Sequence, residues 1–133
     1  MELDLYHLIY TSVIDGDVSP SCVGDIIRTS RVKNRLDEIT GLLVFDGWRF
    51  CQYIEGEREA VRSLAQIICE DVRHTQFTVL HEAPLDGGRM FADWSMAYAL
   101  SQDDELLPGL SALRGLAAVH RLHGLLPSLD MEP

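Results

Sequence analysis

The chain has 133 residues, of which 47% are hydrophobic, and its formal net charge is −10. This length suits one compact domain, and this apolar content is too high for a disordered chain. The negative charge disfavours nucleic acid as a partner, because affinity for nucleic acid comes largely from Lys and Arg that displace counterions from phosphates.

The N-terminus and the cysteines predict the cellular compartment. The sequence begins Met-Glu-Leu-Asp, without the basic stretch of a signal peptide, and no apolar run approaches the roughly 20 residues of a membrane span. The three cysteines, Cys22, Cys51 and Cys69, show no metal-binding spacing and are odd in number. We therefore expect a cytoplasmic protein with no metal site, no membrane association and no disulfide framework.

The first part of the chain predicts a strand followed by a helix. Residues Leu5 to Ser12 are rich in β-branched, aromatic and aliphatic side chains, which favours a buried strand. Ser19 is a candidate N-cap before a proline, and apolar residues at helical spacing then predict a helix from about Pro20 to Leu36. Asn34 falls near the end of this helix.

A hairpin is the clearest local signal in the sequence. The pair Asp46-Gly47 separates two apolar runs, Ile39 to Phe45 and Trp48 to Glu55, and predicts two strands joined by a type I′ turn. Successive side chains of a strand point to opposite faces, so Gln52 and Cys51 are expected on different sides of the sheet.

The second half predicts a helix, two strands and an amphipathic tail. Gly56 is expected to end the preceding strand, and a 3.6-residue apolar period predicts a helix from Ala60 to about Asp71. Residues Phe77 to Ala83 and Trp94 to Leu100 have the composition of strands. After a polar break, an apolar stripe predicts one appended helix that ends before Pro127. The stripe consists of Leu110, Leu113, Leu116, Ala117, His120, Leu122 and Leu125.

The order of these elements predicts an α+β fold, a ferredoxin-like β-α-β-β-α-β sandwich with an extra C-terminal strand and an appended helix. In this topology the first and third strands are neighbours, so Tyr10 and Gln52 are expected close together on the helix-covered face. We expect the apolar stripe of the tail to pack on the opposite face, or on a second chain.

Several polar side chains interrupt this apolar scaffold: Tyr10, Asn34, Gln52, Asp71, Arg73 and His74. A buried glutamine without a partner costs about 1–3 kcal/mol, so Gln52 needs a dedicated partner, which a ligand can supply. Each of these residues also has an ordinary structural explanation, such as a helix cap or a local ion pair. Trp94 and Met96 are residue types that usually fill cores. The residues alone predict a polar-lined pocket and name no ligand.

Two other functional classes remain open at this point. One is a small acylphosphatase-like hydrolase, but the loop after the first strand carries Asp15 and Asp17, which repel phosphate. The phosphate-loop, dinucleotide-binding, zinc-protease and nucleophile-elbow motifs are all missing from the sequence. The other class is a purely structural dimerisation domain or ligand-binding regulatory domain.

Six segments resemble the BLUF family of short flavin-binding blue-light sensors. They extend from about Tyr6 to Met96 and read HLIYTS, RVKN, ITGLL, GWRFCQYIEG, EDVRHT and FADWSM. Each segment is weak alone, but their order and spacing make a chance match improbable. The resemblance implies that residues 1–101 form the BLUF domain and that residues 102–133 form a helical extension.

The resemblance also implies a photoreceptor that is not an enzyme and that binds FAD, with FMN as the alternative, without a covalent bond. In the family's mechanism the excited flavin takes an electron and then a proton from the tyrosine, and the glutamine hydrogen bonds rearrange. The photoactive residues implied are Tyr10, Gln52, Trp94 and Met96. The cofactor contacts implied are Tyr10, Ile26, Lys33, Asn34, Gln52, Asp71, Arg73, His74 and Met96. The expected partner is an unidentified downstream protein, or a second copy bound through the sheet face or the C-terminal helix.

Overall fold

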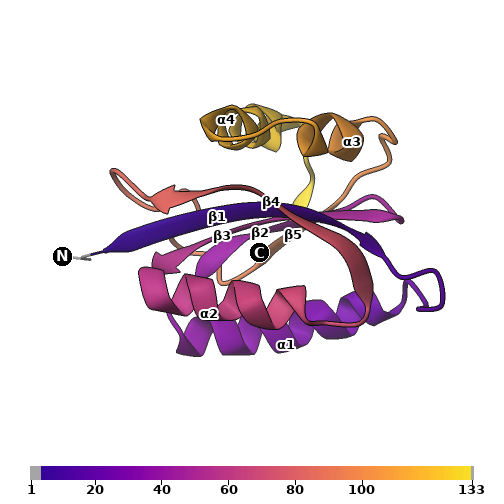
Figure 1. Ribbon diagram of the computed structural model, residues 1–133, viewed down its shortest axis with the longest axis horizontal. Coiled ribbons are helices and arrows are strands. Elements are labelled where there is room, and N and C mark those ends of the chain that lie inside the picture. The colour runs from indigo at the N-terminus through magenta and orange to yellow at the C-terminus, as the bar shows by residue number, and fades with distance from the viewer. Residues whose placement is uncertain (1–3, 133) are drawn as a thin grey trace.

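The computed structural model describes residues 4–132, which form one six-stranded sheet with helices on both faces (Figure 1). The strands are β1 (Leu5–Ile14), β2 (Thr40–Phe45), β3 (Arg49–Glu57), β4 (His74–Pro84), β5 (Ala97–Leu100) and β6 (Met131–Glu132). The helices are α1 (Cys22–Leu36), α2 (Arg58–Cys69), α3 (Leu106–Ser111), α4 (Leu116–Leu125) and the 3-10 helix η1 (Leu126–Ser128).

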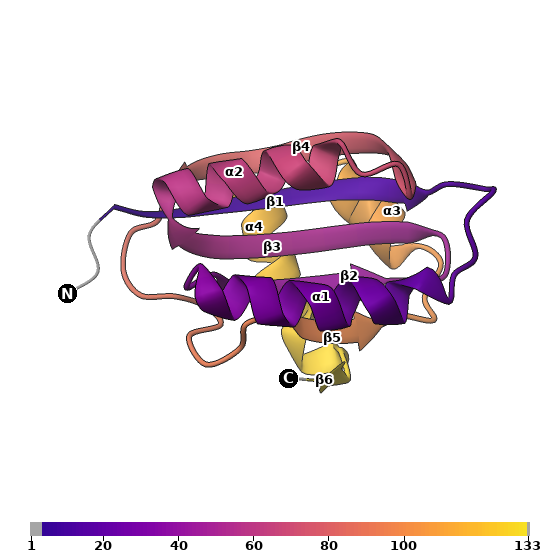
Figure 2. The ribbon, with the colours of Figure 1, turned by 90° about the horizontal axis from the view of Figure 1, so that it is seen from below.

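The layers are those of the predicted α+β sandwich. The strand order is β4-β1-β3-β2-β5-β6, with β5 parallel to β2 and the other neighbours antiparallel. Helices α1 and α2 lie side by side under one face, while α3 and α4 cover the other (Figures 1 and 2). The ferredoxin-like fold class predicted from the order of elements is confirmed.

The centre of the sheet pairs β1 with β3, as predicted. Tyr10 lies directly opposite Gln52 in this pairing. Cys51 and Tyr53 point to the other face, where they join the core formed with the buried tail residues Leu107 and Leu110. The tail therefore packs on the face opposite Gln52, which the alternation of side chains along β3 led us to expect.

The start of α1 and the end of β3 differ from the prediction because local hydrogen bonds and strand pairing override residue propensity. Helix α1 begins at Cys22 with Ser21 as its N-cap, because the Ser19 hydroxyl instead accepts the Ser21 N–H in a local turn. Strand β3 continues through Gly56, since Gly56 is paired with Tyr6 of β1.

The hairpin between β2 and β3 forms, but without the predicted type I′ turn. That turn needs two successive residues with positive φ, and within this loop only Gly47 has one, at 93°. The Asp46 carboxylate accepts the backbone N–H groups of Trp48 and Arg49 and so shapes the turn. Strand β5 is also shorter than predicted, because Trp94 N–H donates to the Phe91 carbonyl in a turn that precedes it.

The tail forms two helices and a short strand instead of the single predicted helix. Gly115, with φ of 70°, separates α3 from α4, and its N–H donates to the carbonyl of Leu80 in β4 at 2.9 Å. Residues 131–132 then add β6 to the sheet beside β5. Three residues of the predicted stripe are exposed instead of buried: Leu116, Ala117 and His120. The side of α4 that faces the core carries Ala118, Val119 and Leu122.

Strand β2 lies unusually close to β3 at Gly41. A Cβ at this position would overlap with the carbonyl oxygen of Tyr53, so only glycine fits without moving one of the strands. The Gly41 N–H donates to the Trp94 carbonyl at 3.1 Å. This contact ties the segment before β5 to the sheet.

No helix within residues 4–132 combines the length and apolar character required to cross a membrane. The first three residues, on which the prediction of no signal peptide partly depends, lie outside the described part of the chain, as does residue 133. The division into residues 1–101 and 102–133 stays a prediction. In the structure, α3 and α4 pack on the same sheet to which β6 belongs.

Candidate functional site

A cavity of about 190 Å³ lies between α1, α2 and the sheet. Its wall combines apolar side chains with the polar residues that interrupt the apolar pattern of the sequence. The lining residues are Tyr10, Ile26, Thr29, Ser30, Lys33, Asn34, Leu43, Phe50, Gln52, Leu64, Ile67, Ile68, Asp71, Arg73 and His74. The fold therefore brings together residues from β1, α1, β3 and the α2–β4 connection.

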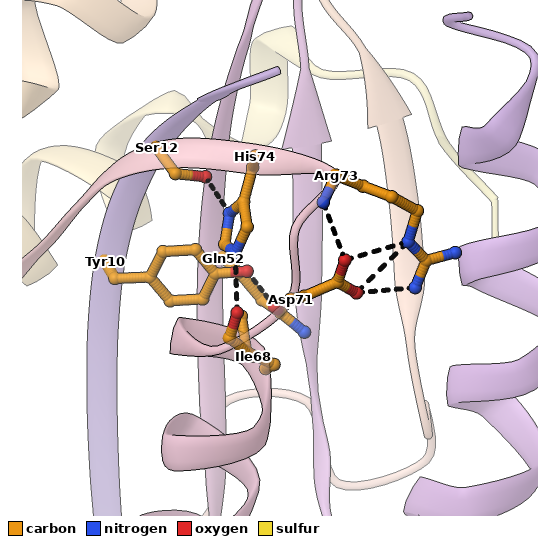
Figure 3. Close-up of polar contacts among 7 residues, drawn as sticks. All are labelled: Tyr10, Ser12, Gln52, Ile68, Asp71, Arg73 and His74. Carbon is orange, nitrogen blue, oxygen red and sulfur yellow. Dashed lines mark hydrogen bonds and ion pairs between the residues drawn. The ribbon is translucent and has the colours of Figure 1, made fainter. Parts of the chain in front are cut away.

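Tyr10 and Gln52 form the polar floor of this cavity. The Tyr10 hydroxyl donates to Gln52 Oε1 at 2.5 Å (Figure 3). The Gln52 amide Nε2 donates to the sulfur of Met96 at 3.6 Å. Burial, followed by the nearby Cys51 and Asp71, raises the pKa of Tyr10 well above its ordinary value. The phenol is therefore neutral and keeps its proton available for the glutamine.

Asn34 points into the cavity from the end of α1 with one half of its amide unused. Its Nδ2 donates to the Ser95 carbonyl at 2.9 Å, which fixes the orientation of the side chain. Its Oδ1 is buried and has no hydrogen-bond partner within residues 4–132. Because an unpartnered buried acceptor is costly, this oxygen is suited to a donor group of a bound molecule.

Asp71 and Arg73 form a bidentate ion pair just after the end of α2. Arg73 Nε lies 3.0 Å from Asp71 Oδ1, and Arg73 Nη2 lies 2.6 Å from Asp71 Oδ2 (Figure 3). The hydrogen bond from Arg73 lowers the pKa of the Asp71 carboxyl, and the same bond raises the pKa of Arg73. The pair stays charged at neutral pH and leaves guanidinium N–H donors at the cavity wall.

Both ring nitrogens of His74 form hydrogen bonds within the protein. Nε2 lies 2.5 Å from the Ile68 carbonyl, and Nδ1 lies 2.7 Å from the Ser12 hydroxyl. A carbonyl only accepts, so the Nε2 proton is on the ring and the Ser12 hydroxyl can donate to Nδ1. His74 therefore presents its ring to the cavity, without a free polar atom.

The structure separates Met96 from Trp94. Met96 is 1% exposed and packs in the core beside α1, in contact with Gln52. Trp94 packs with Phe91 in the core on the opposite face, under the tail. Of the two residues proposed to border the cofactor, only Met96 lies on the cavity side of the sheet.

Lys33 and Ile26 also line the cavity, from α1, so that Met96 is the one expected cofactor contact that is not part of the lining. Lys33 is exposed and pairs with Asp37 at 3.3 Å, so its ammonium group lies at the mouth of the cavity. Ile26 is partly buried and contributes an apolar wall. Among residues 4–132, no group of three or more His, Cys, Asp or Glu side chains is arranged to hold a metal ion.

Sequence reasoning missed two residues that support the site. Arg31 donates from Nε to the Met96 carbonyl at 3.0 Å, and Ser12 bonds to His74. The sequence positions of both residues could have indicated this role. Arg31 precedes Asn34 by three residues on one helix face, and Ser12 shares the face of Tyr10 on β1.

A polar cavity covered by two helices, with a hydrogen-bonded tyrosine and glutamine at its floor, defines a small ligand-binding α+β domain. The family model described as BLUF, sensors of blue-light using FAD, matches residues 5–97. The chain belongs to the BLUF family. It is thus a flavin-dependent sensor of blue light, and the matched domain is a photoreceptor rather than an enzyme.

Two relatives contain the matching segment within much longer proteins. Photoactivated adenylate cyclase subunit beta of Euglena gracilis is 33% identical over 98 residues, which are 74% of this chain and 11% of that protein. The blue light- and temperature-regulated antirepressor BluF of Escherichia coli (strain K12) is 34% identical over 70 residues, 53% of this chain and 17% of that one. The chain therefore spans less than a fifth of each of these two relatives.

Solved structures agree with the fold. The dark-state structure of BlrB, a BLUF protein, superposes with a TM-score of 0.78 at 32% identity and covers 96% of this chain and 98% of its own. BlrP1 of Klebsiella pneumoniae, solved with FMN and cyclic diGMP, superposes at 0.68 and 32% identity, covering 72% of this chain and 26% of its own.

Proposed function

We propose that this chain holds FAD non-covalently in the cavity between α1 and α2 and signals light through Tyr10, Gln52 and Met96. The observation that carries the proposal is the 2.5 Å hydrogen bond from Tyr10 to Gln52 at the floor of the cavity. A glutamine amide has a donor end and an acceptor end, so turning it exchanges the hydrogen bonds it makes.

The polar groups of the cavity fit the edge of a flavin ring. That edge presents one N–H donor between two carbonyl acceptors. The unpartnered Asn34 Oδ1 is an acceptor suited to the N–H, and Arg73 supplies donors suited to a carbonyl. Gln52 Nε2, whose bond within the protein is to the weak acceptor Met96 sulfur, can serve a second carbonyl.

A flavin held in this cavity would supply the absorption of blue light and an acceptor for one electron from the Tyr10 phenol. In the dark, burial keeps the proton on the Tyr10 hydroxyl, which donates to Gln52 Oε1. When Tyr10 loses an electron its hydroxyl becomes strongly acidic, so the proton can move along the short bond to Gln52 Oε1. The Gln52 amide then turns or changes tautomer, and its contacts to Tyr10 and Met96 change. The return of the proton and electron to Tyr10 leaves the rearranged glutamine as the signal.

The choice of FAD rests on the family description, which names FAD, and on Lys33, whose ammonium group at the cavity mouth suits the phosphates of either flavin nucleotide. FMN is the alternative because the related BlrP1 structure was solved with it. Mass spectrometry of the flavin released from purified protein distinguishes the two. We expect FAD.

The output of the domain is a contact with a downstream protein, in the cytoplasm. The tail already covers the sheet face opposite the cavity, so a partner or a second copy would meet α3 and α4 before it met the sheet. Two relatives are named as an adenylate cyclase subunit and an antirepressor, which makes a protein effector the expected class of partner. The net charge of −10 argues against direct binding to nucleic acid.

Absorption spectroscopy of the purified protein tests the proposal. We expect a flavin spectrum in the dark, a shift to longer wavelength after blue light, and full recovery in the dark. A colourless protein that takes up neither FAD nor FMN would contradict the proposed function.

A further inference from the structure

Glu55 is a fully buried carboxylate that the proposed switch does not use. It lies three residues after Gln52 on β3 and, by the alternation of the strand, on the face covered by the tail. Its Oε1 accepts the Met90 N–H at 2.7 Å. Its Oε2 accepts the Phe91 N–H at 2.7 Å and the Thr40 hydroxyl at 2.8 Å. These charge-assisted bonds make a buried carboxylate tolerable and also make it a strong anchor.

The segment that Glu55 anchors leads directly to the cavity. Residues 90–96 belong to no helix or strand, so backbone ladders do not fix their position. The far end of the segment is held by single hydrogen bonds: the Trp94 carbonyl accepts from Gly41, the Ser95 carbonyl from Asn34, and the Met96 carbonyl from Arg31. The near end is held by the two bonds from Met90 and Phe91 to the Glu55 carboxylate. The preceding residue, Arg89, adds bonds to the backbone carbonyls of Glu38 and Glu55 and to the Thr40 hydroxyl.

We propose that Glu55 is a positioning residue for the light switch, because its carboxylate holds residues 90–96 in the arrangement that places Met96 against Gln52. Strand β3 therefore carries Gln52 on one face and, on the other, the anchor for the segment that delivers the neighbour of Gln52. The inference rests on the proposed function, in which Gln52 and Met96 border the flavin. Without the carboxylate, Met96 loses its fixed position beside Gln52.

The test compares Glu55→Gln with two matched variants in the full chain, in the dark. Glu55→Gln keeps the shape but leaves one of the two backbone N–H groups without an acceptor. Thr40→Val removes the hydroxyl bond to the same carboxylate, together with the bond that Arg89 donates to this hydroxyl, and leaves both backbone bonds in place. Glu59→Gln makes the same chemical change at an exposed position on α2.

Two measurements report on the anchor without light. The first is the nuclear Overhauser effect between the Met96 methyl group and the Gln52 side-chain amide. The second is hydrogen exchange of the Met90 and Phe91 amides. In Glu55→Gln we expect the Met96 to Gln52 effect to disappear and the amide left without an acceptor to exchange at least about tenfold faster, while β1 amides stay protected. Thr40→Val and Glu59→Gln should retain the effect.

A folded Glu55→Gln protein that keeps the Met96 to Gln52 effect and the slow exchange of both amides would overturn the inference. If Glu55→Gln does not fold, hydrogen exchange in the wild-type protein tests the inference instead. Its Met90 and Phe91 amides must then exchange as slowly as β3 amides, and exchange as fast as at Gly87 and Gly88 overturns the inference. Both measurements are made without a photocycle. A wild-type protein that shows the Met96 to Gln52 contact but does not respond to light would therefore contradict the proposed function and not the role of Glu55.

Discussion

Tyr10 and Gln52 are directly opposed on β1 and β3, and a 2.5 Å hydrogen bond joins their side chains. The backbone register places the two residues opposite each other, so replacing one of them leaves the other in position. Each half of the pair can therefore be tested separately.

Tyr10→Phe should keep the flavin bound and abolish the normal photocycle. The substitution removes the phenolic O–H while preserving the ring that packs against Phe77. Absorption spectra before and after blue light measure the effect. Tyr6→Phe is the matched control, because Tyr6 shares the same face of β1 and donates to Glu82, away from the cavity. A normal reversible shift in Tyr10→Phe would remove Tyr10 as the electron donor.

Gln52→Leu should also bind flavin and lack the light-induced shift, since leucine has similar bulk but no amide to reorient. Gln66→Leu makes the same replacement on the exposed side of α2 and should leave the shift intact. The measurement is the difference spectrum between lit and dark protein. If Gln52→Leu gives the full shift, the switch lies elsewhere.

Asn34→Ala and Arg73→Ala should weaken flavin binding. A lost hydrogen bond to a buried carbonyl or N–H costs about 1–3 kcal/mol, which corresponds to a rise in Kd of about 5- to 150-fold. Arg73 is partly exposed and stays paired with Asp71, so its effect should fall at the lower end. Arg35→Ala, on the exposed side of α1, is the control for helix stability and charge. Titration of flavin-free protein gives the Kd values, and unchanged values in both variants contradict the proposed pocket.

Cys51 should resist alkylation in the native protein. Burial under the tail raises the pKa of its thiol to about 12, so only about one molecule in ten thousand carries the reactive thiolate at pH 8. Cys69 is exposed and should react first. Since folding raises this pKa, the stabilising contribution of the protonated thiol is complete below pH 9.0 and declines towards pH 12. Mass spectrometry after iodoacetamide treatment, with and without denaturant, measures the order of reaction.

The tail should relay the state of β3 to the surface. Cys51 and Tyr53 contact the tail-side core while Gln52 faces the cavity, so two arrangements of α3 and α4 with different contacts to that core would couple them. We expect light to change hydrogen exchange along Leu110 to Leu125. A protein truncated after Ser101 should keep much of its photocycle, if soluble, and lose light-dependent association or partner binding. Identical exchange in lit and dark full-length protein excludes the relay.

The sequence predicted the elements that depend on local patterns. Alternation along the strands, the helical periods and the Asp46-Gly47 pair together defined the first four strands and both cavity helices. The same alternation placed Tyr10 beside Gln52, because the topology makes β1 and β3 neighbours. Long-range pairing decided what local patterns did not. Gly56 remains in a strand because β1 pairs with it, and β6 exists because β5 offers a free edge.

Side-chain choices in the site were harder to predict. Trp94 and Met96 lie in cores on opposite faces of the sheet although they are two residues apart, because residues 90–96 belong to no helix or strand and no periodicity applies to them. The split of the tail at Gly115 depends on a hydrogen bond to β4, which is distant in sequence. In both cases contacts between remote residues override the local signal.

The close approach of β2 to β3 at Gly41 affects the packing on both faces of the sheet. Leu43 of β2 lines the cavity, and Leu42 packs in the core under the tail. Any side chain at position 41 would push β2 away from the Tyr53 carbonyl and so shift both leucines together. The spacing of one strand pair thus sets the width of the cavity and the packing of α3 and α4 at the same time, and a change in one brings a change in the other.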